Sequence, residues 1–280
     1  MEPIYKIKSD RQSDDGFIYV ASRDRMYYEF AINACESLKA FHPNSHVTLF
    51  THENFLDDRA KVFDNVVTNI PIHIRSKMWC MARTPYKRTI YVDADSLVNH
   101  RDIKKMHDFL DDCDMFFTPV FDYAAGSFKW TTMDIARTEY PKYHGSLCGY
   151  HKTDLLIDFM QTWFDDYVIQ RSTPWTYEKE GLYYKEWQQF DMFTLWQMTC
   201  NKFDKYKRFH NLNIKLIPAR WNSMAQYLIE DKGKQPVIYH MDSHTQQSMP
   251  NLWAKINKGA TDEAYSVKKR AINDPFIEYN

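Results

Sequence analysis

The chain contains the segment Thr89-Ile-Tyr-Val-Asp93-Ala-Asp95-Ser-Leu-Val98, in which β-prone residues run into two carboxylates one residue apart. A strand that ends this way places Asp93 and Asp95 at its C-terminal edge, where an open α/β sheet binds its ligands. Two carboxylates at that edge suit a divalent cation, and the cation in turn suits a phosphate. The segment therefore predicts a site for a metal ion and a phosphate. The competing interpretation is that the two residues only end a strand and cap a turn.

The composition fits a globular protein without a strongly charged partner. At 280 residues, 44% of them hydrophobic, the chain can build one large domain or two small ones. The 36 basic and 37 acidic residues nearly cancel, so no overall field attracts nucleic acid or a membrane surface. No apolar run approaches the ~20 residues of a membrane span. We therefore expect neither a nucleic-acid partner nor a membrane span, and the composition does not indicate an oligomeric state.

The cysteines and the start of the chain indicate a cytoplasmic protein. The 5 cysteines are odd in number and widely spaced, which fits neither a disulfide framework nor a zinc site. We expect reduced, buried thiols. Residues 1–8 contain no apolar segment typical of a secretory signal.

Strand and helix patterns alternate along the chain. Predicted strands cover 17–21, 47–50, 66–70, 89–92, 115–120, 214–217 and 237–239, and 145–150 reads as a turn or short strand. Predicted helices cover the residues after Asp24 as far as Phe41, then 76–84, 153–167 and 186–199. This alternation predicts an α/β fold with a Rossmann-like, mainly parallel central sheet flanked by helices. The aromatic segment 121–143 reads as an acceptor site or as a packed surface excursion.

We expect a single domain over 1–280, because the sequence shows neither a repeat nor a linker. Within it, about 14–100 forms the nucleotide-binding part, about 101–260 the acceptor-side part, and 261–280 a tail. The loop after the first of these strands is the expected nucleotide site, with Ser22 and Tyr27 as candidate contacts. A capping serine and a buried tyrosine are the alternatives for these two residues.

Residues 76–98 closely resemble the glycogenin-like glycosyltransferases of family 8. In that family a helix with a Lys or Arg leads through a Tyr or Pro into a strand ending in Asp-Ala-Asp. The spacing from Lys77 through Tyr86 to Asp93 matches without a gap. Residues 17–38 are similar, though less closely, to the family's first strand and helix. His240 follows an apolar strand and resembles the family's late histidine, which is its third metal ligand.

The resemblance implies a GT-A fold and a nucleoside diphosphate sugar donor, usually a UDP-sugar. It also implies Mn²⁺ or Mg²⁺ as cofactor and transfer with retention of anomeric configuration. The acceptor is left open among glycan, protein, lipid and small molecule. Two carboxylates and an imidazole suit Mn²⁺ better than Mg²⁺, which prefers oxygen ligands. The implied metal ligands are Asp93, Asp95 and His240. The implied donor-binding residues are Ala21, Ser22, Tyr27, Lys77, Asp93, Ala94, His144, Gly145 and Lys255.

The segment after His240 departs from the family pattern. Where the family has a glycine and then a phosphate-binding lysine, this chain has Ser243 and Gln246, so Lys255 is the candidate replacement. His244 is an alternative to His240 as the metal ligand.

Two further segments also depart from the pattern. The family's Asn-Ala/Ser-Gly segment corresponds here to residues 144–146, read His-Gly-Ser. The Asp-Gln pair corresponds to Gln188-Gln189. Asp191, three residues after Gln188, is then the candidate catalytic carboxylate, with Gln189 beside it.

Two other functions remain open. Haloacid-dehalogenase-type phosphatases also carry a strand ending in Asp-x-Asp, but normally on their first strand and with a Gly after the second Asp. Here at least two strand-helix units come before Asp93, and Ser96 occupies the Gly position. The divergent segments 144–146 and 188–189 are also compatible with a non-catalytic sugar-nucleotide-binding domain.

Overall fold

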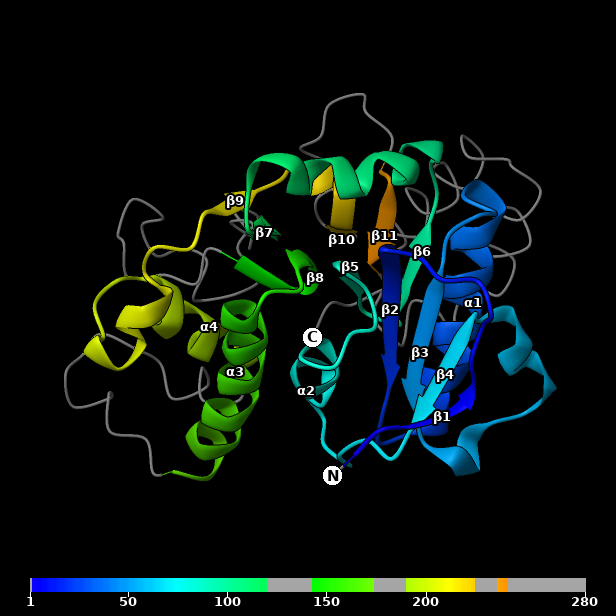
Figure 1. Cartoon of the computed structure of the whole chain (residues 1–280), viewed down its shortest axis with the longest axis horizontal. Coiled ribbons are helices and arrows are strands. Elements are labelled where there is room, and N and C mark those ends of the chain that lie inside the picture. The colour runs from blue at the N-terminus through cyan, green and yellow to red at the C-terminus, as the bar shows by residue number, and fades with distance from the viewer. Residues whose placement is uncertain (1, 120–142, 174–189, 225–235, 241–280) are drawn as a thin grey trace, which may run out of the picture.

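The structure, a computed structural model, describes residues 2–119, 143–173, 190–224 and 236–240. A central sheet of eight strands runs through it in the order β1-β4-β3-β2-β5-β8-β7-β9 (Figure 1). Its strands are β1 (Ile4–Ile7), β2 (Asp15–Ala21), β3 (Val47–Thr51), β4 (Asn65–Thr68), β5 (Arg88–Val92), β7 (Met115–Pro119), β8 (Tyr143–His151) and β9 (Ile214–Leu216). The expected α/β fold with a large central sheet flanked by helices is confirmed.

One half of the sheet is parallel and the other is mixed. Strands β4, β3, β2 and β5 are parallel neighbours, as the alternating pattern predicts. Strand β8 then runs antiparallel to both β5 and β7, whereas β7 and β9 are parallel. Strand β8 spans nine residues, so the turn or short strand expected at 145–150 is a full strand. The edge strand β1, which pairs antiparallel with β4, was not predicted.

The helices cover both faces of the sheet. Helix α1 (Arg25–Phe41) lies on one face together with the 3-10 helix η3 (Arg101–Asp112). Helices α2 (Lys77–Met81), α3 (Asp154–Ser172) and α4 (Asp191–Thr199) lie on the other face. Side chains of β2 alternate between the two cores, since Phe17 and Tyr19 join the first and Ile18 and Val20 the second. A strand buried on both faces explains the unbroken apolar run in the sequence.

Local signals explain where the helices begin. Asp24 accepts a hydrogen bond from the Met26 amide at the start of α1, and Thr153 accepts one from the Leu156 amide at the start of α3. Helix α2 is shorter than the predicted 76–84. The first residues of the helix predicted at 186–199 lie outside the described residues, and α4 begins at Asp191.

A second, three-stranded sheet joins distant parts of the chain. It consists of β10 (Ser223–Met224), β11 (Ile238–His240) and β6 (Ser96–Val98), in that order. Strand β11 runs antiparallel to β6, with His240 opposite Ser96. His240 ends a short apolar strand, as the sequence indicates, but this strand belongs to the small sheet and not to the main one. The small sheet brings His240 directly beside the residue that follows Asp95.

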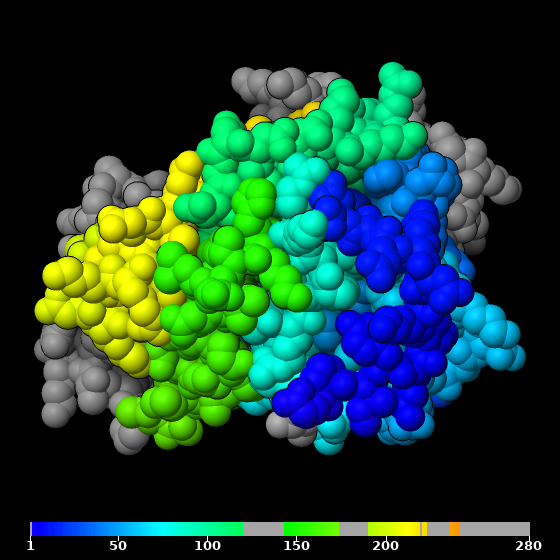
Figure 2. Space-filling view, viewed as in Figure 1, coloured from blue at the N-terminus to red at the C-terminus, as the bar shows by residue number. Residues whose placement is uncertain are grey.

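Other features of the fold concern the surface and the cysteines. In the space-filling view, α3 (green) lies against the yellow part that contains α4, and the N-terminal segment (blue) covers the other side of this face (Figure 2).

All five cysteines are free, and four of them are buried, as expected for reduced thiols. Among the described residues, no helix has the length and apolar character needed to cross a membrane.

Candidate metal and donor site

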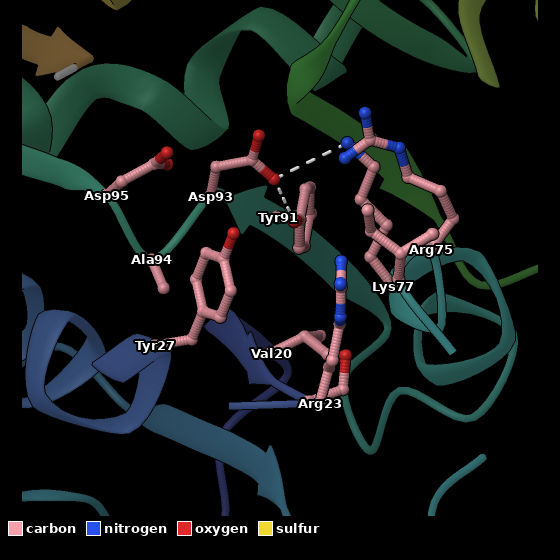
Figure 3. Close-up of a pocket in the computed structure, with 11 residues that line it drawn as sticks. Val20, Arg23, Tyr27, Arg75, Lys77, Tyr91, Asp93, Ala94 and Asp95 are labelled. Atoms are coloured by element: carbon pink, nitrogen blue, oxygen red, sulfur yellow. Dashed lines mark hydrogen bonds and ion pairs between the residues drawn. The ribbon is translucent and has the colours of Figure 1, made fainter. Parts of the chain in front are cut away.

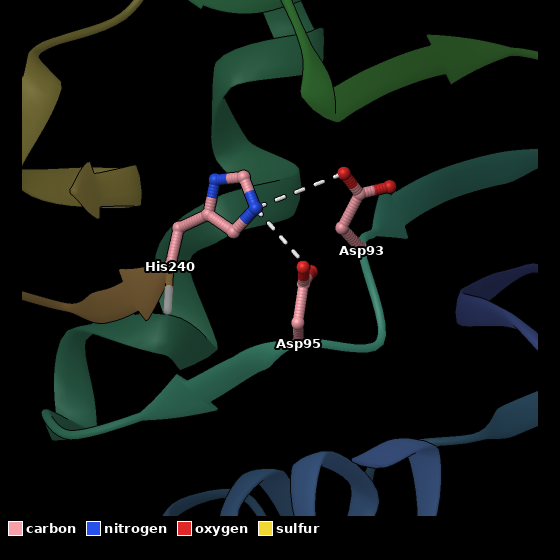
Figure 4. A group of neighbouring side chains, drawn as sticks. All are labelled: Asp93, Asp95 and His240. Atoms are coloured by element: carbon pink, nitrogen blue, oxygen red, sulfur yellow. Dashed lines mark ion pairs between the residues drawn. The ribbon is translucent and has the colours of Figure 1, made fainter. Parts of the chain in front are cut away.

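The turn between β5 and β6 carries Asp93 and Asp95. The Asp93 amide donates to the Ser146 carbonyl of β8 at 2.8 Å, which fixes the start of the turn. Ala94 is 4% exposed and packs into the core on the α1 side, so the residue between the carboxylates anchors the turn. Figure 4 shows that the two flanking carboxylates point toward His240.

Asp93, Asp95 and His240 form one cluster. The His240 Nε2 atom lies 3.3 Å from Asp95 Oδ1 and 3.8 Å from Asp93 Oδ2, as Figure 4 shows. One ligand atom from each residue lies within 4.8 Å of the others, which is close enough for a single ion. Burial alone lowers the pKa of His240, but the charges of Asp95 and Asp93 outweigh it, so this pKa is raised overall. The cluster therefore carries a negative potential that a cation would neutralise.

Lys77 connects this cluster to the core. Its ammonium group donates to the Gly145 carbonyl at 2.7 Å, and it lies 3.4 Å from Asp93 Oδ1 and 3.3 Å from Asp191 Oδ2. The Tyr91 hydroxyl donates to the same Asp93 oxygen. Burial raises the pKa of Asp93. The charges of Lys77 and His240 and the hydrogen bond from Tyr91 lower this pKa by more than burial raises it, so the net pKa is lowered. Asp93 is thus held as a carboxylate.

Asp191 forms ion pairs with two basic side chains, Arg75 and Lys77. Its Oδ1 atom lies 2.9 Å from Arg75 Nε, and its Oδ2 atom faces Lys77. Its side chain is only 5% exposed. Burial raises its pKa, but Lys77 and Arg75 lower it more, so the net pKa falls. A Cβ atom at Gly145 would come 3.0 Å from Asp191 Oδ2, so the absence of a side chain there makes room for this carboxylate.

A cavity opens in front of these charges. It holds about 550 Å³ of space, part of which is open to solvent, and lies between the β2–α1 loop, the residues before α2 and the Asp93–Asp95 turn (Figure 3). Its lining includes Ser22, Arg23, Tyr27, Arg75, Lys77, Tyr91, Asp93, Ala94 and Asp95. The lining combines aromatic and apolar surface with a few convergent cations and carboxylates, as small-molecule sites do. Such a cavity can bind a metal ion together with an anionic, ring-containing ligand.

Comparison with solved structures shows which fold this is. The glycosyltransferase GlyE of Streptococcus pneumoniae TIGR4 matches with a TM-score of 0.57 and 11% identity, over 93% of this chain and 64% of that one. Its apo form matches with a TM-score of 0.52 and 11% identity, over 95% and 65%. The fold is GT-A. A structure of the galactosyltransferase LgtC with donor and acceptor sugar analogs also aligns, with a TM-score of 0.49 and 11% identity, over 87% and 95%.

The GT-A fold confirms the architecture implied by the sequence resemblance, although membership of family 8 stays a prediction. No family model matches the chain, and no curated protein matches it in sequence. The chain spans about 64% of the length of the GlyE chain. The phosphatase alternative is not favoured, because the fold is GT-A and the Asp93 turn follows the fifth strand of the chain instead of the first.

The residues expected in the donor loop lie at the cavity. Ser22 and Tyr27 line it, whereas Ala21 is fully buried behind them, where its carbonyl accepts from Thr51 Oγ1 at 3.0 Å. The Ser22 hydroxyl donates to the His73 carbonyl at 3.0 Å, so it also braces the loop. Burial is the main cause that raises the pKa of Tyr27, followed by the charge of Asp95.

His144 lies beside the metal cluster. Its ring centroid is 5.5 Å from that of His240, and its Nδ1 atom shares a hydrogen bond with the Ser146 hydroxyl. Burial and then the charge of His240 lower the pKa of His144 to about 3, so this imidazole stays neutral. Gln189 and Lys255 lie outside the described residues. The catalytic role of Asp191 stays a prediction.

Arg75 and Arg23 also line the cavity, and no sequence pattern predicts them as site residues. Arg75 lies in the connection between β4 and α2, where no periodic pattern marks it. Arg23 has a φ of 73°, a left-handed conformation that is uncommon for a residue with a Cβ atom. Such conformations gather at functional sites, but the signal lies in the backbone and not in the sequence.

Proposed function

We propose that the chain is a metal-dependent glycosyltransferase that uses a nucleoside diphosphate sugar as donor. The donor is a UDP-sugar, and the sugar is transferred with retention of its anomeric configuration. The observation that carries the proposal is the joining of Asp93, Asp95 and His240 beside a cation-lined cavity in a GT-A fold. The donor set of two partly buried carboxylates and one imidazole suits Mn²⁺ better than Mg²⁺. The acceptor is a glycan, a protein, a lipid or a small molecule.

A bound divalent ion would neutralise the negative charge that develops on the departing diphosphate. Asp93, Asp95 and His240 would hold it, with the imidazole in its neutral form. Tyr91 and Lys77 orient Asp93, since both contact its Oδ1 atom and leave Oδ2 turned to the metal cluster. Lys77 also adds fixed positive charge where anionic oxygens would lie, and a cation held in place needs little rearrangement during the reaction.

The cavity wall also fits a nucleoside. Tyr27 provides aromatic surface, and Ala94 and Val20 provide small apolar contacts in the same cavity. Ser22 holds the loop through its bond to the His73 carbonyl. A base would lie on this side of the cavity, and the diphosphate would extend toward the Asp93–Asp95 turn.

The test is a panel of sugar nucleotides and nucleoside diphosphates, measured by thermal shift and by slow hydrolysis with and without Mn²⁺. A ligand at ~100 times its Kd stabilises the fold by about 2.7 kcal/mol, which gives a visible shift. We expect UDP or a UDP-sugar to stabilise the protein only with Mn²⁺, and one UDP-sugar to release UDP. The proposal fails if none of the UDP, GDP, ADP, CDP or dTDP compounds binds in the presence of Mn²⁺.

A matched pair of variants separates the site from general effects. Asp95→Asn should abolish the Mn²⁺-dependent shift. Asp102→Asn is the control, because the Asp102 side chain is similarly exposed, at 22% against 21%, and also lies beside a histidine, at 3.4 Å from His100. It does not line the cavity. Equal losses in both variants would contradict the assignment of Asp95.

A further inference from the structure

We propose that Arg75 binds the terminal phosphate of the donor's diphosphate, the phosphate that carries the sugar. Its guanidinium group would donate hydrogen bonds to that phosphate, while Asp191 would hold the guanidinium group on its buried side. This inference rests on the proposed function, because it assigns a part of the same ligand to a residue of the same cavity. Arg75 would then be the second basic side chain of the donor site, beside Lys77.

The geometry gives Arg75 a buried side and an open side. The Nε atom is buried and lies 2.9 Å from Asp191 Oδ1. The side chain as a whole is 29% exposed, against 9% for Lys77 and 5% for Asp191, and it lines the cavity that Asp191 does not line. Asp191 is the ion-pair partner of Arg75 among the described residues. The rest of the guanidinium group is therefore available to a ligand.

Arg75 and Lys77 lie side by side because they share Asp191. Figure 3 shows the guanidinium group next to the Lys77 ammonium, which in turn contacts Asp93 at the metal cluster. An anion that bridges the metal cluster and these cations must lie within reach of Arg75. A sugar phosphate bound at the Asp93 turn fits this position.

Charge favours an anion at this place over a purely structural role. Lys77, Arg75, Asp93 and Asp191 together are formally neutral, and a divalent ion beside Asp95 turns the whole group positive. Excess positive charge in a partly buried cavity is costly without an anionic partner. A diphosphate supplies that partner. The planar guanidinium group also offers parallel N–H donors that match two oxygens of one phosphate, which an ammonium group cannot do.

The experiment compares UDP with UMP, each with Mn²⁺, by calorimetry on the full chain, and uses inorganic pyrophosphate with Mn²⁺ as a probe without a base. Arg75→Gln should weaken UDP and pyrophosphate binding at least tenfold and change UMP and Mn²⁺ binding less than twofold. Arg75→Lys should recover only part of the loss, because it keeps the charge without the paired donors. Arg88→Gln is the matched control.

Arg88 is a suitable control because its side chain is 31% exposed and also pairs with an aspartate, Asp15, but at the opposite end of β5. If Arg75→Gln does not fold, Asp191→Asn is compared with the Arg75→Gln/Asp191→Asn double variant, in which the buried charges balance. The double variant should then bind UDP and pyrophosphate at least tenfold more weakly than Asp191→Asn does.

The outcomes distinguish the inference from the function it rests on. Wild-type binding of UDP by Arg75→Gln overturns the inference and leaves the glycosyltransferase proposal standing. An equal loss for UDP and UMP overturns the assignment to the terminal phosphate. A wild-type chain that binds no nucleoside diphosphate with Mn²⁺ overturns the proposed function, and this inference falls with it.

Discussion

Asp191→Asn tests whether the buried ion-pair cluster holds the site together. The change keeps the size of the side chain but removes the negative charge between Arg75 and Lys77. Lys77 keeps Asp93 at 3.4 Å and the Gly145 carbonyl at 2.7 Å, so the uncompensated charge falls mainly on Arg75. Loss of one partner of a buried pair costs about 3–5 kcal/mol, and the contacts that remain to Lys77 place this change at the lower end, about 3 kcal/mol. Urea denaturation measures it, and a fall in Tm of roughly 6 °C or more should accompany it.

The destabilisation should depend on pH in a defined direction. The pKa of Asp191 is lowered in the folded protein, because the pull of Lys77 and Arg75 outweighs the cost of burial. A carboxyl group with a lowered folded pKa contributes its stabilisation above its unfolded pKa of about 3.9 and loses it as the pH falls through the folded value. Wild type and Asp191→Asn should therefore differ at neutral pH and converge in strong acid.

The control is Asp158→Asn. Asp158 pairs with Arg208 at 2.6 Å, but both side chains are nearly half exposed, at 47% and 46%. Solvent screens such a pair, so its loss should cost less than about 1 kcal/mol. The reasoning is refuted if Asp191→Asn costs no more than Asp158→Asn at neutral pH, or if its effect does not shrink in acid.

The other predictions concern ligand binding. Lys77→Ala should raise the Kd of UDP with Mn²⁺ at least tenfold by calorimetry, and an unchanged Kd would remove Lys77 from the site. His240→Ala and Asp95→Ala should fold but lose Mn²⁺ binding measured by electron paramagnetic resonance, and retained binding would refute the cluster. Mn²⁺ affinity should begin to fall already above pH ~6.5, the usual histidine value, because Asp95 and Asp93 raise the pKa of His240 and protons compete with the metal for its imidazole. His144→Gln should keep that pH dependence, since the pKa of His144, about 3, lies far below it. Tyr91→Phe should weaken Mn²⁺ binding by roughly tenfold or more, as loss of a bond that orients a ligand does, and wild-type affinity would contradict its role.

The sequence predicts the parallel half of the fold well, because its signals are local there. Strands β2, β3, β4 and β5 are buried on both faces and read as apolar runs, and helix α1 has a capping residue, Asp24, and helical spacing. The Asp93–Asp95 pair is also local, since a turn with a buried Ala94 turns both carboxylates the same way. These features need no knowledge of distant partners.

The rest of the site depends on contacts far apart in the chain. The small sheet pairs β6 with β11, which begins 140 residues after β6 ends, and neither three-residue strand has a strong pattern. Arg75 has no periodic context, and its partner Asp191 comes from the start of α4. An ion pair between a loop and a helix start leaves no mark in local spacing. Functional residues in loops, such as Arg75, can therefore be recognised only once the fold is known.

Asp93 joins the two halves of the candidate site. Its Oδ1 atom accepts from the Tyr91 hydroxyl and faces Lys77, whereas its Oδ2 atom faces His240. One carboxylate thus belongs both to the metal cluster and to the network of Lys77, Arg75 and Asp191. A cation bound at Oδ2 draws negative charge away from Lys77, which leaves Lys77 freer to attract a phosphate. Metal and diphosphate binding should strengthen each other for this reason, and linkage requires the same coupling factor in both directions.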